Sequence, residues 1–420
     1  MPHQVAITIL AAVRPGQTAA LTEALQQMDG DDQRKSLLPF EALAVHFARF
    51  VVLDETGDLA GARIGPSLVF LSDVDSPAGH YLRELAEQGG KGLDLIFAHC
   101  EDYPESPTPH QRIEYLRSKT IRTDTAYVNT VGRSVRQVHD EARLRTAIGA
   151  FLDSGQWAGQ GPEDVRRAVK DFVASDATLR WALQPAAPPG RLWRLKEKAH
   201  LIGAGAVVAA LLPVIAIGFP FWLITLRIHE LRDKASSAVP DRAALDRLEE
   251  MEDRLVQNQI SAVGFVKPGQ FRLQTFRAVL WILSYASRHI YNHGNLAGIT
   301  TIHFARWVFL DDRRRLIFAS NYDGSIESYM DDFIDKVAYG LNAAFSNGVG
   351  YPKTRWLLMG GAKDEQAFKN YLRTHQIPTQ IWYSAYGDLS ARNIADNASI
   401  RAGLSAKLSD AESAAWARRL

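Results

Sequence analysis

The sequence predicts an α+β protein with two tandem βαββαβ repeats packed as a pair and a helical, membrane-associated insert between them. The first observation is a repeated decapeptide, VHFARFVVLD at 45–54 and IHFARWVFLD at 302–311, with residue 302 aligned on residue 45 at an offset of 257. The second is that the similarity continues in register on both sides of this segment. The third is an uncharged stretch of twenty-six residues, Leu201 to Leu226, that separates the two copies.

Bulk composition limits the functional classes. The 420 residues are 46% hydrophobic and 23% charged, which is typical of globular domains. The formal net charge of +1 gives no indication of a nucleic-acid partner. A single cysteine, Cys100, excludes a disulfide framework and a Cys-rich metal site. The N-terminus has no Lys or Arg before its first apolar run, so we expect a strand there and not a signal peptide.

The first repeat, residues 1–149, is expected to begin with four strands and two helices in ferredoxin-like order. β-branched runs, alternation and apolar residues at helical spacing predict these elements: a strand at 5–13, a helix at 18–28, strands at 43–53 and 67–72, a helix at 78–88 and a strand at 93–99. A helical appendix follows, with helices at 111–119 and from 135, and a short strand at 126–129. Ser134 and Gln137 predict a capping box at the last helix.

The insert, residues 150–260, should contain a helix at 162–173, a linker at 184–190 and a helix at 241–257. Its hydrophobic segment, 201–226, is long enough to cross a bilayer. Both flanks are basic, and Pro213, Gly218 and Pro220 should kink the helix or break it into a helical hairpin. We therefore expect a re-entrant or in-plane anchor that leaves both repeats on the cytoplasmic face. A single span and a buried soluble helix are the alternatives.

The second repeat, residues 261–405, follows the first at three offsets, and residues 406–420 form a tail. The opening strand and turn of residues 262–270 repeat those of the first copy, and a helix is expected at 271–288. At an offset of 248, Asp323 aligns with Asp75 and Tyr329 with Tyr81. At 256, the appendix recurs, with Tyr383 on Tyr127. A unit that occurs twice indicates a fused pair and not a solenoid.

The duplicated architecture resembles the dimeric α+β barrel superfamily, which includes the dye-decolourising peroxidases and chlorite-dismutase-like proteins. Asp323-Gly324 matches the end of the Gly-x-x-Asp-Gly motif of dye-decolourising peroxidases, with Ser320 in place of the first glycine. The resemblance implies that haem could be a cofactor, with Asp323 on its distal side. The residues eligible as the proximal ligand are His289, His293, His303 and His375.

The candidate catalytic residues are His303, Arg306 and Asp323. Strand alternation places His303, Ala305 and Trp307 on one face and Phe304, Arg306 and Val308 on the other. His303 or Arg306 could face a cleft as a base, ligand or anion clamp. Because His46 and Arg49 repeat them, both could instead fix sheet packing. Asp323 could likewise be a turn residue and the N-cap of the next helix. Arg392 and Asp396, like Arg136 and Asp140, should form i,i+4 pairs.

The aromatic residues that distinguish the second copy could line an apolar substrate pocket, with Trp307, Tyr322, Trp382 and Tyr383 as its candidates. Two functional hypotheses follow. The first is a membrane-anchored oxidoreductase, peroxidase-like, that acts on a small hydrophobic compound at His303, Arg306 and Asp323. The second is a non-catalytic protein of the membrane surface that binds lipid or assembles a complex. The expected partners are the bilayer and a small hydrophobic ligand.

Overall fold

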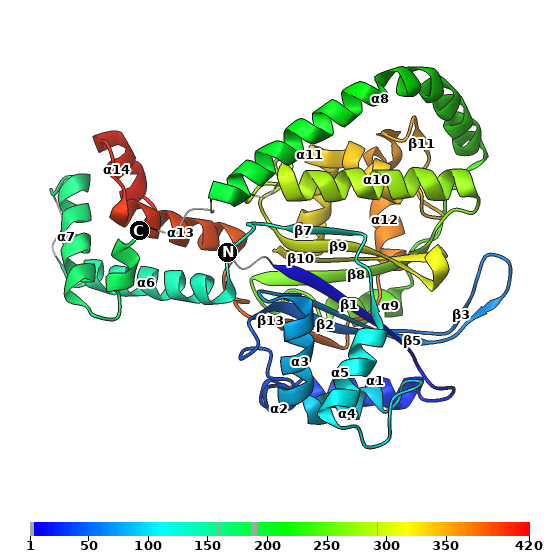
Figure 1. The fold of residues 1–420 in the computed structure, drawn as a ribbon, viewed down its shortest axis with the longest axis horizontal. Helices are drawn as coiled ribbons and strands as arrows, with labels where there is room; N and C mark the ends of the chain where they lie inside the picture. The colour runs from blue at the N-terminus through cyan, green and yellow to red at the C-terminus, as the bar shows by residue number, and fades with distance from the viewer. Residues whose placement is uncertain (1–3, 156, 158, 186–190, 292) are drawn as a thin grey trace.

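Two antiparallel sheets form the centre of this α+β protein in the computed structural model, which describes residues 4–155, 157, 159–185, 191–291 and 293–420 (Figure 1). The first sheet has the order β13-β2-β5-β1-β6 and the second has the order β7-β9-β10-β8. The strands of the two sheets are β1 (Val5–Ala12), β2 (Val45–Leu53), β5 (Ser67–Val74), β6 (Thr120–Ile121), β7 (Thr125–Val128), β8 (Gln257–Phe265), β9 (Ile302–Leu310), β10 (Arg315–Asp323) and β13 (Ile381–Ser384). Two small hairpins are β3 (Thr56–Gly57) with β4 (Arg63–Ile64), and β11 (Thr354–Arg355) with β12 (Met359–Gly360).

Helices cover the outer faces of both sheets. The first sheet packs on α1 (Thr18–Met28), α2 (Asp31–Leu37), α3 (Ala78–Gln88), α4 (Gly90–Phe97) and α5 (Pro109–Ser118). The second packs on α10 (Gln270–His289), α11 (Ile326–Phe345) and α12 (Glu365–His375). The inner faces meet in a small apolar layer that includes Val51, Leu71, Val308 and Ile317. The result is a helix–sheet–sheet–helix arrangement, as expected for sheets that are apolar on both faces.

Each sheet receives a strand from the other half of the chain. β7, from the first appendix, pairs with β9, so that Tyr127 lies opposite Ala305. β13, from the second appendix, pairs with β2, so that Tyr383 lies opposite Ala48. The short strand predicted at 126–129 is therefore present as β7, and both β7 and β13 pair with the sheet of the other half. This reciprocal exchange ties the two halves together through backbone hydrogen bonds.

The predicted strand at 93–99 is wrong. The segment forms α4, Gly90–Phe97, in which Leu93, Ile96 and Phe97 are buried. Their spacing of three and four positions is helical, and it outweighs the β propensity of the individual residues. The edge of the first sheet beside β1 is instead occupied by β6. The corresponding residues of the second half, Leu341 and Phe345, belong to the end of α11.

The hydrophobic segment lies in one long helix, α8, Arg191–Arg232, which contains Pro213 and Pro220. Of the two expected outcomes, a kinked helix or a helical hairpin, the structure has the first, because the chain bends at this segment without reversing. Figure 1 shows α8 as an arch above α10. Among the described residues, one helix, Ala199–Arg232, is long and apolar enough to cross a membrane, and no residue in its most apolar window is buried.

A separate helical lobe is built from both halves. It consists of α6 (Val135–Asp153), α7 (Pro162–Ser175), α13 (Ala391–Ser405) and α14 (Asp410–Ala417) around a common apolar core (Figure 1). The predicted tail thus carries α14. The helix expected at 241–257 is shorter, α9 (Arg242–Glu249), because β8 begins at Gln257. The expected linker at 184–190 lies mostly outside the described residues.

Candidate functional site

The two repeated histidines form equivalent buried pairs with aspartates. His303 Nε2 lies 2.7 Å from Asp323 Oδ1, and His46 Nε2 lies 2.9 Å from Asp75 Oδ1. The second oxygen of Asp323 accepts the backbone N–H of Ala391 at 2.8 Å, at the start of α13. Asp75 does the same for the first residue of α6, at 2.7 Å. Each His–Asp pair therefore joins a sheet to a helix of the lobe.

The interpretation of Asp323 as the cap of the next helix is wrong. The N-cap of α11 is Ser325, whose hydroxyl accepts the N–H of Ser328. Asp323 instead accepts the N–H of Ala391, the first residue of α13, whose N-cap is Ser390. Ser134 caps α6 as expected, although the side chain of Gln137 bonds Glu141 and does not complete a capping box.

The repeated arginines reach across into the opposite sheet. Arg49 Nη1 donates to the carbonyl oxygen of Ile260 at 2.7 Å, and Arg306 Nη1 donates to that of Ile7 at 2.7 Å. Arg49 also bonds Asn321, whereas Arg306 forms an ion pair with Asp73, the residue at the equivalent place. Burial and the nearby Arg306 cation lower the pKa of Arg49 to about 9, and its several acceptors stabilise the charged form.

The surroundings of these groups leave little space. The His303 ring lies 5.6 Å from the ring of Phe47, and the His46 ring lies 5.0 Å from that of Phe304. The hollow that adjoins both histidines has a volume of about 20 Å³, and the hollow beside both arginines about 10 Å³. A small-molecule pocket typically needs ~300 Å³ or more. The groups are arranged to hold the sheets together.

Haem does not fit at Asp323 and His303. Both carboxylate oxygens of Asp323 are engaged, and the ring of His303 is bonded and enclosed by aromatic side chains. Among the other histidines, His375 directs Nδ1 to the carbonyl oxygen of Tyr371, and the His289 ring stacks 5.4 Å from that of His200. Within the described residues, no group of three or more His, Cys, Asp or Glu side chains is placed to hold a metal.

The four aromatic candidates do not line one pocket. Trp307 and Tyr322 lie in the core between the second sheet and its helices, where Tyr322 stacks on Tyr329 at 3.9 Å. Tyr383 packs on Phe40 in the core of the first half. Trp382 donates its Nε1 to Asn321 at 3.0 Å. Three of the four therefore fill the two helix-side cores, and only Trp382 reaches a cleft.

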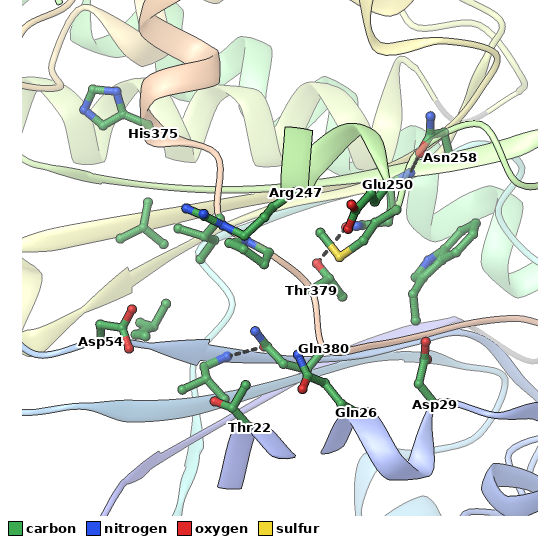
Figure 2. A pocket seen from close by; sticks show the side chains of 18 of the residues that line it. Thr22, Gln26, Asp29, Asp54, Arg247, Glu250, Asn258, His375, Thr379 and Gln380 are labelled. Atoms are coloured by element: carbon green, nitrogen blue, oxygen red, sulfur yellow. Dashed lines mark hydrogen bonds between the residues drawn. The ribbon is translucent and has the colours of Figure 1, made fainter. Parts of the chain in front are cut away.

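That cleft, here called the α9 cleft, has a volume of about 1140 Å³ and is lined by α9, β8, α1, the end of β2 and residues 375–382. Figure 2 shows Arg247 on α9 and Glu250 just after its end above, Thr22 and Gln26 on α1 below, and Gln380 between them. Gln380 accepts the backbone N–H of Val52 through its side-chain oxygen at 2.7 Å. The α9 cleft is lined by equal numbers of cations and anions, namely Arg34, Arg247, Arg254, Arg315, Asp29, Asp54, Glu55 and Glu250.

A second cleft, here called the α8 cleft, lies at the equivalent place in the other half and has a volume of about 1350 Å³. It is lined by α8, α10, residues 121–124 and the turn after β9. Asp124 takes the place of Gln380 and accepts the N–H of Phe309 at 2.9 Å, as Gln380 does for Val52. Its charged lining residues are four cations and two anions, namely Arg122, Arg277, Arg288, Arg313, Asp124 and Asp312.

Three cations act on one partly buried acid in the α8 cleft. Burial raises the pKa of Asp124, while its backbone hydrogen bond and the charges of Arg122, Arg313 and Arg277 oppose that increase. Among the described residues, none of these three arginines forms a salt bridge within 4.0 Å. The cleft therefore presents an excess of positive charge beneath an apolar helix.

Sequence reasoning missed both clefts, because their linings come from segments as far apart in the sequence as Thr22 and Trp382 in the α9 cleft, and Ile121 and Arg313 in the α8 cleft. The signal available in the sequence was the arginines at 122, 277 and 313 of the α8 cleft. Two of them align with uncharged residues of the α9 cleft, Arg122 with Pro378 and Arg313 with Thr56. No protein-family model matches the chain, and no curated protein sequence matches it significantly. The functional conclusion therefore depends on the geometry.

Proposed function

We propose that this protein is a non-catalytic protein of the membrane surface, anchored by α8, which binds lipid and holds its two halves on the same side of the bilayer. We further propose that the halves are duplicated ferredoxin-like units, paired as in the dimeric α+β barrel superfamily. The reciprocal contacts of Arg49 and Arg306 and the exchanged strands β7 and β13 support the duplication. These units differ from the simple βαββαβ pattern, because a helix takes the place of the expected fourth strand.

The observation that carries the proposal is the attachment of α8 to α10 at both of its ends. Near the start, Tyr285 donates its hydroxyl to the carbonyl oxygen of His200 at 3.2 Å. Near the other end, Trp222 donates its Nε1 to the hydroxyl of Thr275 at 3.2 Å, and the His229 ring stacks 5.0 Å from that of Phe271. Both ends of the apolar helix therefore return to one surface (Figure 1).

The lengths of the two helices agree with an arch. At ~1.5 Å per residue, the segment from His200 to Trp222 would span about 33 Å if straight, but Thr275 and His289 are only about 21 Å apart along α10. The excess length bends outward, and the crest carries apolar side chains such as Leu212, Val214 and Ile217, which are 55%, 67% and 71% exposed. A crest of this kind is suited to the lipid interface. The basic residues on both flanks favour the cytoplasmic face.

A second apolar projection accompanies the arch. The tip of the β11–β12 hairpin exposes Leu358 and Met359, and it rises beneath α8 in Figure 1. Trp356 and Leu357 adopt left-handed φ values of 57° and 66°, which are unfavourable for bulky residues. The buried carboxylate of Glu230 on α8 accepts the N–H groups of both residues, at 2.9 and 2.7 Å. The end of the anchor thus holds the hairpin in its exposed conformation.

Vesicle flotation tests the proposal. The full chain, reconstituted from mild detergent into phosphatidylcholine vesicles, should float with the lipid. The double variant Leu212→Glu and Ile217→Glu should lose at least ten-fold of its floating fraction, because charges on the crest oppose insertion. The matched control is Leu59→Glu with Leu95→Glu, two exposed leucines of the first half. If the crest variant floats as well as the control, the proposed anchor is wrong.

Cysteine accessibility tests whether the halves share one side. Leu59→Cys and Ile282→Cys place thiols at exposed positions in the first and second halves. In sealed vesicles, an impermeant maleimide should label both positions to the same extent. Labelling of one position and protection of the other until detergent is added would show that α8 crosses the bilayer.

A further inference from the structure

We infer that the α8 cleft is a binding site for the head group of an anionic lipid, with the phosphate among Arg122, Arg277 and Arg313 and the acyl chains along α8. This inference rests on the proposed membrane function and specifies its ligand. The ligand should be an anionic amphiphile, because one wall of the cleft is cationic and another wall is apolar.

The cationic wall comes from three separate segments. Arg122 follows β6, Arg277 lies on the second turn of α10, and Arg313 lies in the turn after β9. All three are exposed, and all three line the same cleft as Asp124, on whose carboxyl their charges act. Arginine is suited to this role, because its planar guanidinium group matches phosphate oxygens in a bidentate geometry.

The position of Arg313 depends on an unfavourable backbone conformation. Asp311, Asp312 and Arg313 have consecutive φ values of 49°, 53° and 70°, in the left-handed region that an arginine rarely adopts. Asp311 holds this turn, because its carboxylate accepts from Arg315 Nε at 2.5 Å and its carbonyl from the N–H of Arg314 at 3.1 Å. The first half has a loop nine residues longer at this place. Unfavourable backbone conformations of this kind concentrate at ligand-binding sites.

The apolar wall is the anchor itself. On α8, Gly203, Ala204, Val207 and Val208 line the cleft, and small side chains at 203 and 204 leave room between α8 and α10. On α10, Trp281 is 65% exposed and stacks with Tyr285 at 6.0 Å. Trp and Tyr are the residues that favour the head-group level of a bilayer. An acyl chain leaving this cleft along α8 would therefore enter the lipid that surrounds the crest.

Binding of short-chain lipids to the detergent-solubilised full chain tests the inference. Dihexanoyl phosphatidylglycerol is the anionic probe, dihexanoyl phosphatidylcholine is the zwitterionic control, and inorganic phosphate separates a lipid site from a simple anion site. The test variant is Arg277→Gln with Arg313→Gln. The matched control is Arg247→Gln with Arg254→Gln, two exposed arginines of the α9 cleft.

We expect the anionic lipid to bind at least ten-fold more tightly than either the zwitterionic lipid or phosphate. The test variant should lose at least ten-fold in affinity and the control less than two-fold. Equal losses in the two variants, or phosphate binding as tight as lipid binding, would overturn the inference. Both variants should still float with phosphatidylcholine vesicles, so a failure of the anchor and a failure of the head-group site give different results.

Discussion

The α8 cleft and the α9 cleft occupy equivalent places in the two halves and differ in what lines them. Both have a floor in which a side chain accepts a strand N–H, Asp124 from Phe309 and Gln380 from Val52. The α9 cleft is lined by four cations and four anions, the α8 cleft by four cations and two anions. The α9 cleft lies beneath a short polar helix, and the α8 cleft lies beneath an apolar arch.

This difference separates the contacts that the two halves have in common from those that only one half has. The pairs formed by the histidines and arginines are alike in both halves, so they account for packing and not for a single active site. The helix beside each cleft differs, because α1 ends at Met28 after 11 residues, whereas α10 continues for 20 residues and reaches both ends of α8. The additional length of α10 gives the α8 cleft its Trp281, whereas Arg277 lies within the part that α1 also has.

The largest expected effect tests the shared framework. Arg306→Met leaves the buried Asp73 without its partner, and breaking such a pair typically costs about 3–5 kcal/mol in the free energy of unfolding. Arg49→Met should cost a similar amount, because it leaves several buried acceptors unpaired. Urea denaturation of each variant measures the loss. Arg392→Met is the control, since its side chain is 88% exposed and its pair with Asp396 is 3.8 Å long. A loss below about 1 kcal/mol for Arg306→Met would contradict a structural role.

A smaller effect should be confined to the α8 side. Glu230→Ala removes the acceptor of two backbone N–H groups and of the Thr354 hydroxyl, at a cost of about 2–3 kcal/mol. Because the contact joins only α8 and the β11–β12 hairpin, hydrogen exchange should accelerate there and remain unchanged around the α9 cleft. Equal acceleration in both regions would show that the two clefts are not independent.

The smallest effect is expected when the negative charge of Asp124 and the neutral state of Gln380, the side chains on the floors of the two clefts, are exchanged. Asp124→Asn keeps an oxygen for the N–H of Phe309 and removes one negative charge. Affinity for dihexanoyl phosphatidylglycerol should rise about three- to five-fold, or about 1 kcal/mol, as expected for one partly exposed charge. The converse variant Gln380→Glu adds a charge to the α9 cleft and should leave this affinity unchanged. A decrease with Asp124→Asn would show that the carboxylate itself contacts the ligand.

The sequence allowed some of this framework to be predicted. The α+β class is confirmed, as are most of the predicted strands and helices, and the constant offsets align residues with similar contacts, such as Arg49 and Arg306. The exchange of β7 and β13 could not be predicted, because a four-residue strand carries no information about its partner. The strand predicted at 93–99 is the helix α4, because the helical spacing of Leu93, Ile96 and Phe97 outweighs the β propensity of the individual residues. The predicted aromatic pocket is absent from the described residues, because Trp307 and Tyr322 face the helices of their own half.

Quenching by spin-labelled lipid tests the central claim, that lipid enters the α8 cleft and not its counterpart. An environment-sensitive fluorophore is attached at Ser284→Cys in the α8 cleft and, in a second variant, at Gln26→Cys in the α9 cleft. The buried Cys100 can remain, because burial raises its pKa to about 12 and leaves it unreactive. In vesicles that contain anionic lipid with a nitroxide on the acyl chain, the label at 284 should be strongly quenched and the label at 26 should not. Equal quenching at the two positions, or none at 284, would contradict the account.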